Sequence, residues 1–540
     1  MRRAMKIVQV LMIVALLFAV CPLKMSARAT DDRNYEAHFR AKPIGGTTWG
    51  EYTRLSYTPK DTRFVMVASN DKDPGHVVVV FAENLTGQYD WYFTESFDNG
   101  ETWSSPAIAV NPSFDIWLSE IFTAAMDMGE DGVVHMTFAR AKKFNTNQPT
   151  GIYYARYDGS GWSAPIPVQE EMSPGTLRLY TNDIKVGKDN NTIHVAYGSD
   201  YPGHDNGDTW YSKSFDGGNT WSTPVNINQD NGMDVGYRPS LAADKNGNVY
   251  KANDGGWPGW IWFRSSPDNG ASWTSHMQIG QPSYEHRKPM VMCDNNGGVY
   301  MVYMREAPNE YTLMYKNSND YGSTWIPSTQ GGIILKSFIP GMGTWYHAEL
   351  DDDGYIHIVH GSMATGIMEA YYMKIDTQGN IVVPSEIITP DDGHASYPTG
   401  LSLDGDNVYV TTRDYAPTLA QSTIDIDPNT LNLKSKGKWI TCYIELPPGY
   451  DVKDINASTI LLEDSLPPIL DLKYGFVKSE SSYIIDHDGD GILERMVKFD
   501  RSDVQDILSP GIYNLKVYGK LLEGTTFEGY SDEISVIDPS

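Results

Sequence analysis

Five arginines are the first candidates for chemistry in this acidic chain, because a guanidinium can hold a carboxylate through two parallel hydrogen bonds. Each lies where the sequence predicts a loop or a strand end: Arg140, Arg238, Arg287, Arg305 and Arg413. Their concentration predicts an acidic ligand. The alternative is that each arginine pairs with an acidic neighbour in its own loop, as Arg305-Glu306 and Arg413-Asp414 suggest.

Aromatic side chains occur in the same predicted loops. The run Asn253-Asp-Gly-Gly-Trp-Pro-Gly-Trp260 has glycines that let a ligand approach the backbone, and Trp257 and Trp260 offer apolar faces for a sugar ring. A packed turn is the alternative. The arginines and the tryptophans together predict a surface that binds a glycan or a glycoprotein.

A short acidic segment near the C-terminus could hold a metal. Asp486, Asp488 and Asp490 alternate along the chain before Gly491, as in the first half of a calcium-binding loop, and Glu494 offers a further oxygen. Val497 stands where a complete EF-hand loop has its bidentate glutamate. We expect either a structural calcium or a plain acidic turn here, and no cofactor elsewhere in the chain.

Charge and cysteine content exclude several classes of protein. The formal net charge of -27 repels a phosphate backbone, so nucleic acid is not an expected partner. The three cysteines are Cys21, Cys293 and Cys442, and the last two fall in different predicted domains, so no disulfide framework is expected. The chain is expected to be a monomer.

Residues 1–29 have the pattern of an export signal. Arg2, Arg3 and Lys6 precede an apolar run, and Ala27-Arg28-Ala29 is a small-x-small cleavage site. We expect cleavage after Ala29 and a protein that is secreted or periplasmic, or associated with the cell surface. Lipid attachment at Cys21 is the alternative. No later segment has enough consecutive apolar residues to cross a membrane.

Two repeats decide the expected architecture. The pattern Ser-x-Asp-x-Gly-x-Thr/Ser-Trp recurs with its aspartate at positions 98, 216, 268 and 320, and weaker copies lie at 158 and 376. Seven turn-plus-strand segments, the first at 75–81 and the last at 407–411, follow a second register. These patterns predict an all-β fold, a β-propeller over 30–422, with seven blades favoured and six as the alternative. The last blade is expected to be closed by residues 47–57, and residues 423–540 are expected to form an immunoglobulin-like β-sandwich.

The repeated pattern resembles the Asp box of the sialidase superfamily and of other BNR-repeat propellers, over roughly residues 45–420. The resemblance implies that the boxes are structural, lie between the third and fourth strands of a blade, and face away from the ligand. It also implies a tyrosine nucleophile, Tyr346 or Tyr397, with Asp115 as the acid, and Arg238 and Arg287 as two of three arginines that hold the substrate. The segment Phe64–Ala68, where that family opens its first blade with an arginine, carries none.

Histidines on the same expected face give a second enzymatic candidate. His347 and His360 are expected on neighbouring strands of one blade, close enough to share a site. Propeller polysaccharide lyases use a histidine or tyrosine as base and an arginine to neutralise the uronate. The sequence therefore predicts an acidic-glycan-binding propeller, with a sialidase-like hydrolase, or behind it a uronate lyase, as the enzymatic alternative.

Overall fold

The computed structural model describes residues 35–538 of the 540-residue chain, except 57–61, 84–88, 111–123, 141–149, 172–177, 188, 201–207, 229–235, 256–258, 281–283, 308–309, 329–330, 339–344, 391–394, 416–418, 448–449, 464, 470–482 and 523–525. The predicted signal segment and Cys21 lie outside the described residues.

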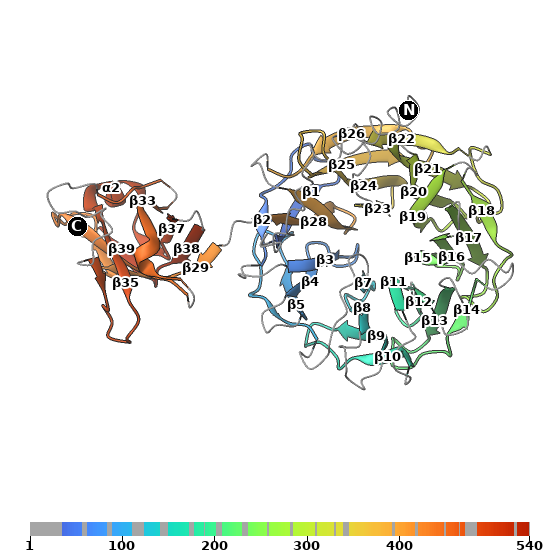
Figure 1. Cartoon of the computed structure of the whole chain (residues 1–540), viewed down its shortest axis with the longest axis horizontal. Helices are drawn as coiled ribbons and strands as arrows, with labels where there is room; N and C mark the ends of the chain where they lie inside the picture. The colour runs from blue at the N-terminus through green and yellow to red at the C-terminus, as the bar shows by residue number, and fades with distance from the viewer. Residues whose placement is uncertain are drawn as a thin grey trace, which may run out of the picture. The chain divides into compact units, whose positions relative to one another are not determined.

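Seven four-stranded antiparallel sheets stand around a common centre and form a seven-bladed propeller (Figure 1). The first three blades are built from β3 (Thr62–Ala68), β4 (Val77–Glu83), β5 (Asp90–Ser96), β6 (Ala107–Ile108), β7 (Ala124–Met128), β8 (Val134–Arg140), β9 (Thr150–Tyr157), β10 (Ile166–Glu171), β11 (Arg178–Val186), β12 (Ile193–Asp200), β13 (Asp208–Ser214) and β14 (Val225–Asn226). The next three are built from β15 (Tyr237–Ala243), β16 (Val249–Gly255), β17 (Trp260–Ser266), β18 (Met277–Ile279), β19 (Glu285–Cys293), β20 (Val299–Ala307), β21 (Glu310–Ser318), β22 (Ile333–Phe338), β23 (Tyr346–Leu350), β24 (Tyr355–Ser362), β25 (Glu369–Asp376) and β26 (Ile381–Ile387). The seven-blade prediction is confirmed.

The seventh blade joins the two ends of the propeller. Its inner strands are β27 (Ser396–Leu403) and β28 (Asn407–Tyr415), and its outer strands are β1 (Tyr35–Pro43) and β2 (Thr53–Arg54). All nine residues of β1 pair with β28. The expectation that residues 47–57 close the ring was therefore wrong in its bounds, because the main closing strand lies upstream and this segment supplies only β2.

The Asp boxes lock the hairpins between third and fourth strands. In the first box the Asp98 carboxylate accepts hydrogen bonds from the Thr102 amide at 2.8 Å and from the Ser96 hydroxyl at 2.7 Å. The Ser96 hydroxyl oxygen in turn accepts the Gly100 amide at 2.8 Å. The same bonds recur around Asp216, Asp268 and Asp320. The repeated motif is thus satisfied within its own turn.

Each strong box also fastens its blade to the preceding one. Trp103 packs edge-on against Phe39 of the seventh blade, with ring centroids 4.7 Å apart. Gly100 has a φ of 86°, and a Cβ on it would lie 2.1 Å from a carbon of the same Phe39 ring. Glycine is therefore required twice at this position, for the turn and for the close approach. The equivalent tryptophan pairs are Trp221 with Tyr154, Trp273 with Tyr211, and Trp325 with Phe263.

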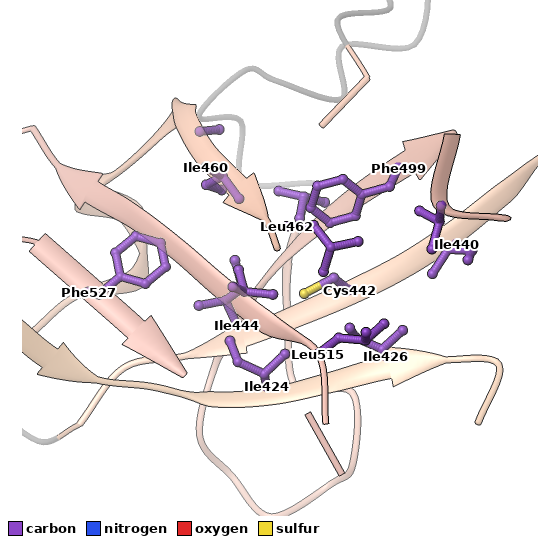
Figure 2. Packing of buried hydrophobic residues seen from close by; sticks show 14 of the residues in the cluster. Ile424, Ile426, Ile440, Cys442, Ile444, Ile460, Leu462, Phe499, Leu515 and Phe527 are labelled. Carbon is purple, nitrogen blue, oxygen red and sulfur yellow. The ribbon is translucent and has the colours of Figure 1, made fainter. Parts of the chain in front are cut away.

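The C-terminal module is a small β-sandwich. Its elements are β29 (Leu419–Gln421), β30 (Thr423–Asp427), β31 (Thr430–Asn432), β32 (Trp439–Glu445), η2 (Val452–Asp454), β33 (Ile455–Leu462), β34 (Ile484–Ile485), β35 (Glu494–Asp500), α2 (Arg501–Ile507), β36 (Gly511–Tyr513), β37 (Lys516–Leu521), β38 (Thr526–Tyr530) and β39 (Ile534–Ile537). Ile444, Leu462, Phe499 and Phe527 come from different strands and meet in one apolar core, which also buries Cys442 (Figure 2). Within the described residues, no helix is long and apolar enough to span a bilayer.

Candidate functional site

The candidate residues gather at one end of the propeller, where the innermost strand of each blade begins and the second strand ends. Inner strands bring Arg238, Arg287, Tyr346, His347 and Tyr397 to this end. Second strands bring Arg140, Asp254, Arg305 and Arg413 to it. The propeller topology therefore delivers both sets to one face, as the sequence predicted. Asp115 and Trp257 lie outside the described residues, as does the side chain of Arg140.

Arg238 and Arg287 converge, but each is already paired with carboxylates. Arg238 Nη1 lies 2.6 Å from Asp254 Oδ2. Arg287 forms ion pairs with Glu285 and with Glu306, whose Oε2 lies 3.2 Å from its Nε. We call these five residues the charge cluster. Two guanidinium groups face three carboxylates, so the cluster presents no net positive charge to a ligand.

The backbone within and next to the charge cluster is held in an uncommon conformation. Arg238 and Lys288 have φ values of 45° and 52°, which place them in the left-handed region. Both lie where the pairing between first and second strands shifts register. Phe64, with a φ of 50°, occupies the same kind of shift in the first blade. Because Phe64 has no charge to position, the strained bulge belongs to the blade architecture and not to the site alone.

Tyr346 is inaccessible. Its side chain is fully buried, and its hydroxyl donates to the backbone carbonyl of Lys288. Burial raises its pKa well above the usual value. The Lys288 ammonium lies 5.1 Å from the Tyr346 ring centre, and burial followed by the nearby Arg238 charge lowers the pKa of this lysine well below its usual value. Tyr346 therefore stabilises the bulge at Lys288, below the surface of the propeller face that carries the arginines.

The two candidate histidines do not share a site. Tyr346 pairs with His360 and His347 with Val359 across β23 and β24, and opposite residues of a pair lie on the same face of a sheet. His347 and His360 therefore point to opposite faces, and the expectation that they act together was wrong. Burial, with Lys288 adding to it, lowers the pKa of His347 to about 3. Burial lowers the pKa of His360 to about 4, and its Nε2 lies 2.8 Å from the Ser385 hydroxyl.

Arg413 has different surroundings from Arg238 and Arg287. Its guanidinium carbon lies 4.4 Å from the Tyr35 ring centre, 5.5 Å from that of Tyr397 and 6.0 Å from that of Trp345. The Trp345 and Tyr397 rings are themselves 5.4 Å apart. We call these four residues the aromatic cage. Within the part of the chain that the structure describes, no carboxylate forms an ion pair with Arg413, which stays partly exposed.

The neighbour pairs suggested by the sequence do not form. Consecutive residues of a strand point to opposite faces, so Arg413 and Asp414 diverge, and Asp414 Oδ2 instead accepts the Tyr52 hydroxyl at 3.0 Å. For the same reason Glu306 pairs with Arg287, while Arg305 lies 3.5 Å from Glu310 and donates to Thr312 at 3.1 Å. Trp260 is partly exposed at the start of β17. Arg238, Arg287 and Arg305 thus find their carboxylate partners on their own strand or on an adjacent strand, and not in the next residue of the sequence.

A cavity of about 330 Å³ on the propeller axis was not anticipated from the sequence. Asp127, Asp183 and Glu349 line it around Lys185, whose Nζ lies 3.3 Å from Asp127. Burial raises the pKa of Glu349 to about 7 and that of Asp183 to about 6. The sequence signal that could have predicted this cavity is the occurrence of charged residues in the innermost strands, which are otherwise apolar.

Three of the four predicted metal ligands in the C-terminal module come together. One oxygen each of Asp486, Asp488 and Glu494 lies within 4.8 Å of the others. The Glu494 carboxylate also accepts the His487 amide at 2.8 Å. Each aspartate also accepts a backbone amide of the local turn: Asp486 from Gly489 at 2.8 Å, Asp488 from Asp490 at 3.1 Å and Asp490 from Ile492 at 2.7 Å. The spacing of the three oxygens suits a hard cation such as calcium.

The chain matches no protein-family model and no curated protein sequence. An ulvan lyase of polysaccharide lyase family PL25 superposes with a TM-score of 0.44, at 12% identity, over 71% of this chain and 93% of that one. An α-L-arabinanase of Penicillium chrysogenum, complexed with arabinobiose, gives 0.37 at 11% identity, over 58% and 93%. An α-L-arabinofuranosidase of Fusarium graminearum, also with arabinobiose, gives 0.37 at 11% identity, over 73% and 96%. Similarity this low carries no statement about function.

Proposed function

We propose that this protein is a secreted propeller that binds acidic glycans at the aromatic cage. The observation that carries the proposal is Arg413, a partly exposed guanidinium that three aromatic rings surround and that no described carboxylate neutralises. Aromatic faces with polar edges suit sugar rings, and an unpaired guanidinium suits a carboxylate or a sulfate. The ring and the acidic group of an acidic sugar thus both find a binding partner in the aromatic cage.

The overall charge of the chain makes a local site necessary. A formal charge of -27 creates a field that repels a polyanion at long range. Affinity for an acidic glycan must then come from short-range contacts, where one unpaired arginine among rings dominates. Raising the salt concentration screens the long-range repulsion more than it weakens a close contact.

The enzymatic alternative is a sialidase-like hydrolase, with a uronate lyase behind it. Tyr397 is its best remaining candidate, because this tyrosine is partly exposed and lies beside Arg413. The buried hydroxyl of Tyr346 and the divergent His347 and His360 favour binding over catalysis. If the purified protein releases chromophore from a sialoside, or unsaturated product from a uronate polymer, the binding-only function is wrong.

The proposal is tested by Arg413→Ala on a glycan array followed by calorimetry. Loss of one charge-assisted contact should weaken the binding of acidic glycans by about 10- to 100-fold, while neutral glycans are unaffected. Arg305→Ala is the matched control, because Arg305 lies at the same face over Tyr284 but is already bonded to Thr312 and Glu310. Absence of acidic glycan binding by the unaltered protein would refute the proposed function.

We further propose that Asp486, Asp488 and Glu494 hold a structural calcium ion in the C-terminal module. The proximity of their oxygens supports the proposal. The site would stabilise the turn between β34 and β35.

A further inference from the structure

Among the described residues, three aromatic rings cover the guanidinium of Arg413 and leave one end of it uncovered. Tyr35 covers it at 4.4 Å, and Tyr397 and Trp345 approach it at 5.5 Å and 6.0 Å. The Nε nitrogen is buried and has no hydrogen-bond partner in the described chain. The two Nη nitrogens are not among the buried unsatisfied atoms and carry no hydrogen bond to any described residue, so they reach solvent. With respect to the described residues, the open edge of the group is therefore its Nη end.

We infer that Arg413 binds one oxyanion of the glycan, a carboxylate or a sulfate, end-on through both Nη nitrogens. This inference rests on the proposed function and adds the chemical group that the cage recognises. Approach along the Nε side, the other bidentate geometry open to arginine, is blocked because that nitrogen is buried. The aromatic cage thus fixes the plane in which the two oxygens of the ligand must lie.

The rings also explain why charge alone is insufficient at this position. A planar guanidinium stacks on aromatic faces and keeps its donors in a rigid fork, whereas an ammonium is a compact, strongly hydrated point charge. A lysine at this position would still be cationic, but it could not stack against Tyr35 and present two parallel donors together. The cage is therefore specific for arginine in a way that a simple electrostatic patch is not.

Arg305 shows what the same residue does when one of its Nη nitrogens is occupied. It also lies over an aromatic ring, with its guanidinium carbon 5.0 Å from the Tyr284 centroid. Its Nη2, however, donates to Thr312 and lies 3.5 Å from Glu310. Replacing Arg305 by lysine changes the same chemistry at the same face in a position without a free donor pair, which makes it the matched control.

The test compares Arg413→Lys and Arg305→Lys in the full chain, with four polymers as probes. Polygalacturonate and its methyl ester differ in the carboxylate charge and in one small methyl group on each sugar, and dextran sulfate and dextran differ in the sulfate. We expect Arg413→Lys to weaken binding of at least one charged polymer by about 10- to 100-fold in calorimetry, with Arg305→Lys unchanged. Whichever charged polymer loses affinity identifies the oxyanion. Thermal unfolding confirms that both variants are folded.

Three results distinguish a failure of the inference from a failure of the proposed function. If Arg413→Lys binds within about twofold of the unaltered protein while Arg413→Ala does not, a point charge is enough and end-on recognition is wrong, although glycan binding stands. If the unaltered protein binds none of the four polymers, the proposed function and the inference both fail. Equal affinity for each charged polymer and its neutral counterpart would overturn oxyanion recognition together with the preference for acidic glycans, and would leave only a glycan-binding surface that does not depend on charge.

Discussion

The charge cluster and the aromatic cage lie at the same end of the propeller and both contain arginine, yet they are opposite in electrostatic state. In the charge cluster, Asp254, Glu285 and Glu306 neutralise two guanidinium groups. In the aromatic cage, rings take the place of carboxylates around Arg413. Arginine content therefore says little about anion binding. What matters is which arginines have no acidic partner.

The paired arginines have a structural task that the unpaired one lacks. Asp254 on β16 accepts Arg238 at 2.6 Å and also the backbone amide of Lys288 on β19 at 3.1 Å. It thus joins the fourth and fifth blades. Asp254 is nearly fully buried, and burial raises its pKa although Arg238 opposes the shift. In this buried position the charged form of Asp254 depends on Arg238 for its stabilisation.

The largest effect should come from Arg238→Ala. The substitution leaves Asp254 buried without its counter-ion, which costs about 3 kcal/mol of the free energy of unfolding. Affinity for acidic glycans should stay within about twofold, because Asp254 already neutralises the charge of Arg238. Urea denaturation and calorimetry measure the two quantities separately, and Arg413→Ala should give the reverse result. Loss of affinity without loss of stability would show that Arg238, and not Arg413, contacts the ligand.

A second variant checks the cause of that loss. In the Arg238→Ala background, Asp254→Asn removes the stranded charge while keeping an amide of similar shape. Stability should recover in part relative to Arg238→Ala alone, as a double-mutant cycle would show. An additive loss would mean that the two side chains stabilise the blades independently.

The sequence predicted the propeller because each box carries its own hydrogen-bonding groups within a few residues. Ser96, Asp98 and Thr102 satisfy one turn, so the motif and its spacing suffice. It also predicted which arginines reach one face, because strand order decides that. It did not predict their partners, since strand alternation sends Asp414 away from Arg413 and brings Tyr35, from the other end of the propeller, beside it. Contacts of that range are not encoded locally.

Glu349 extends the comparison to a buried carboxyl inside the molecule, where the nearby Lys185 only partly offsets the effect of burial. Its Oε2 is buried and has no hydrogen-bond partner among the described residues, and burial raises its pKa from 4.5 to about 7. Between these values the folded state holds a proton that the unfolded state has released. Raising the pH from 5 to 7 therefore favours unfolding, by about 2 kcal/mol for this group. A buried carboxyl on the axis responds by protonation, whereas a partly exposed guanidinium stays charged and available.

Glu349→Gln isolates this contribution from that of the other carboxyls that line the axial cavity. Denaturation curves at pH 5, 6 and 7 should show a shallower fall of stability with pH for the variant than for the unaltered protein. The difference between the two slopes removes the contribution of Asp183, whose pKa burial raises to about 6. Parallel slopes would place the titrating group elsewhere.

The smallest effect is expected at the acidic loop of the C-terminal module, where like charges approach one another without an arginine. Asp486, Asp488 and Glu494 gain a common partner only if a cation binds. For an extracellular site of millimolar to submillimolar affinity, millimolar calcium adds about 1 kcal/mol to the stability of the module, and chelator removes it. Thermal unfolding with and without chelator measures this change, and Asp488→Asn should abolish it.

Because the loop is distinct in sequence and chemistry from the aromatic cage, chelator should leave glycan affinity unchanged. A fall in affinity would mean that the cation acts on the propeller. An unfolding temperature that is insensitive to chelator in the unaltered protein would refute the calcium site.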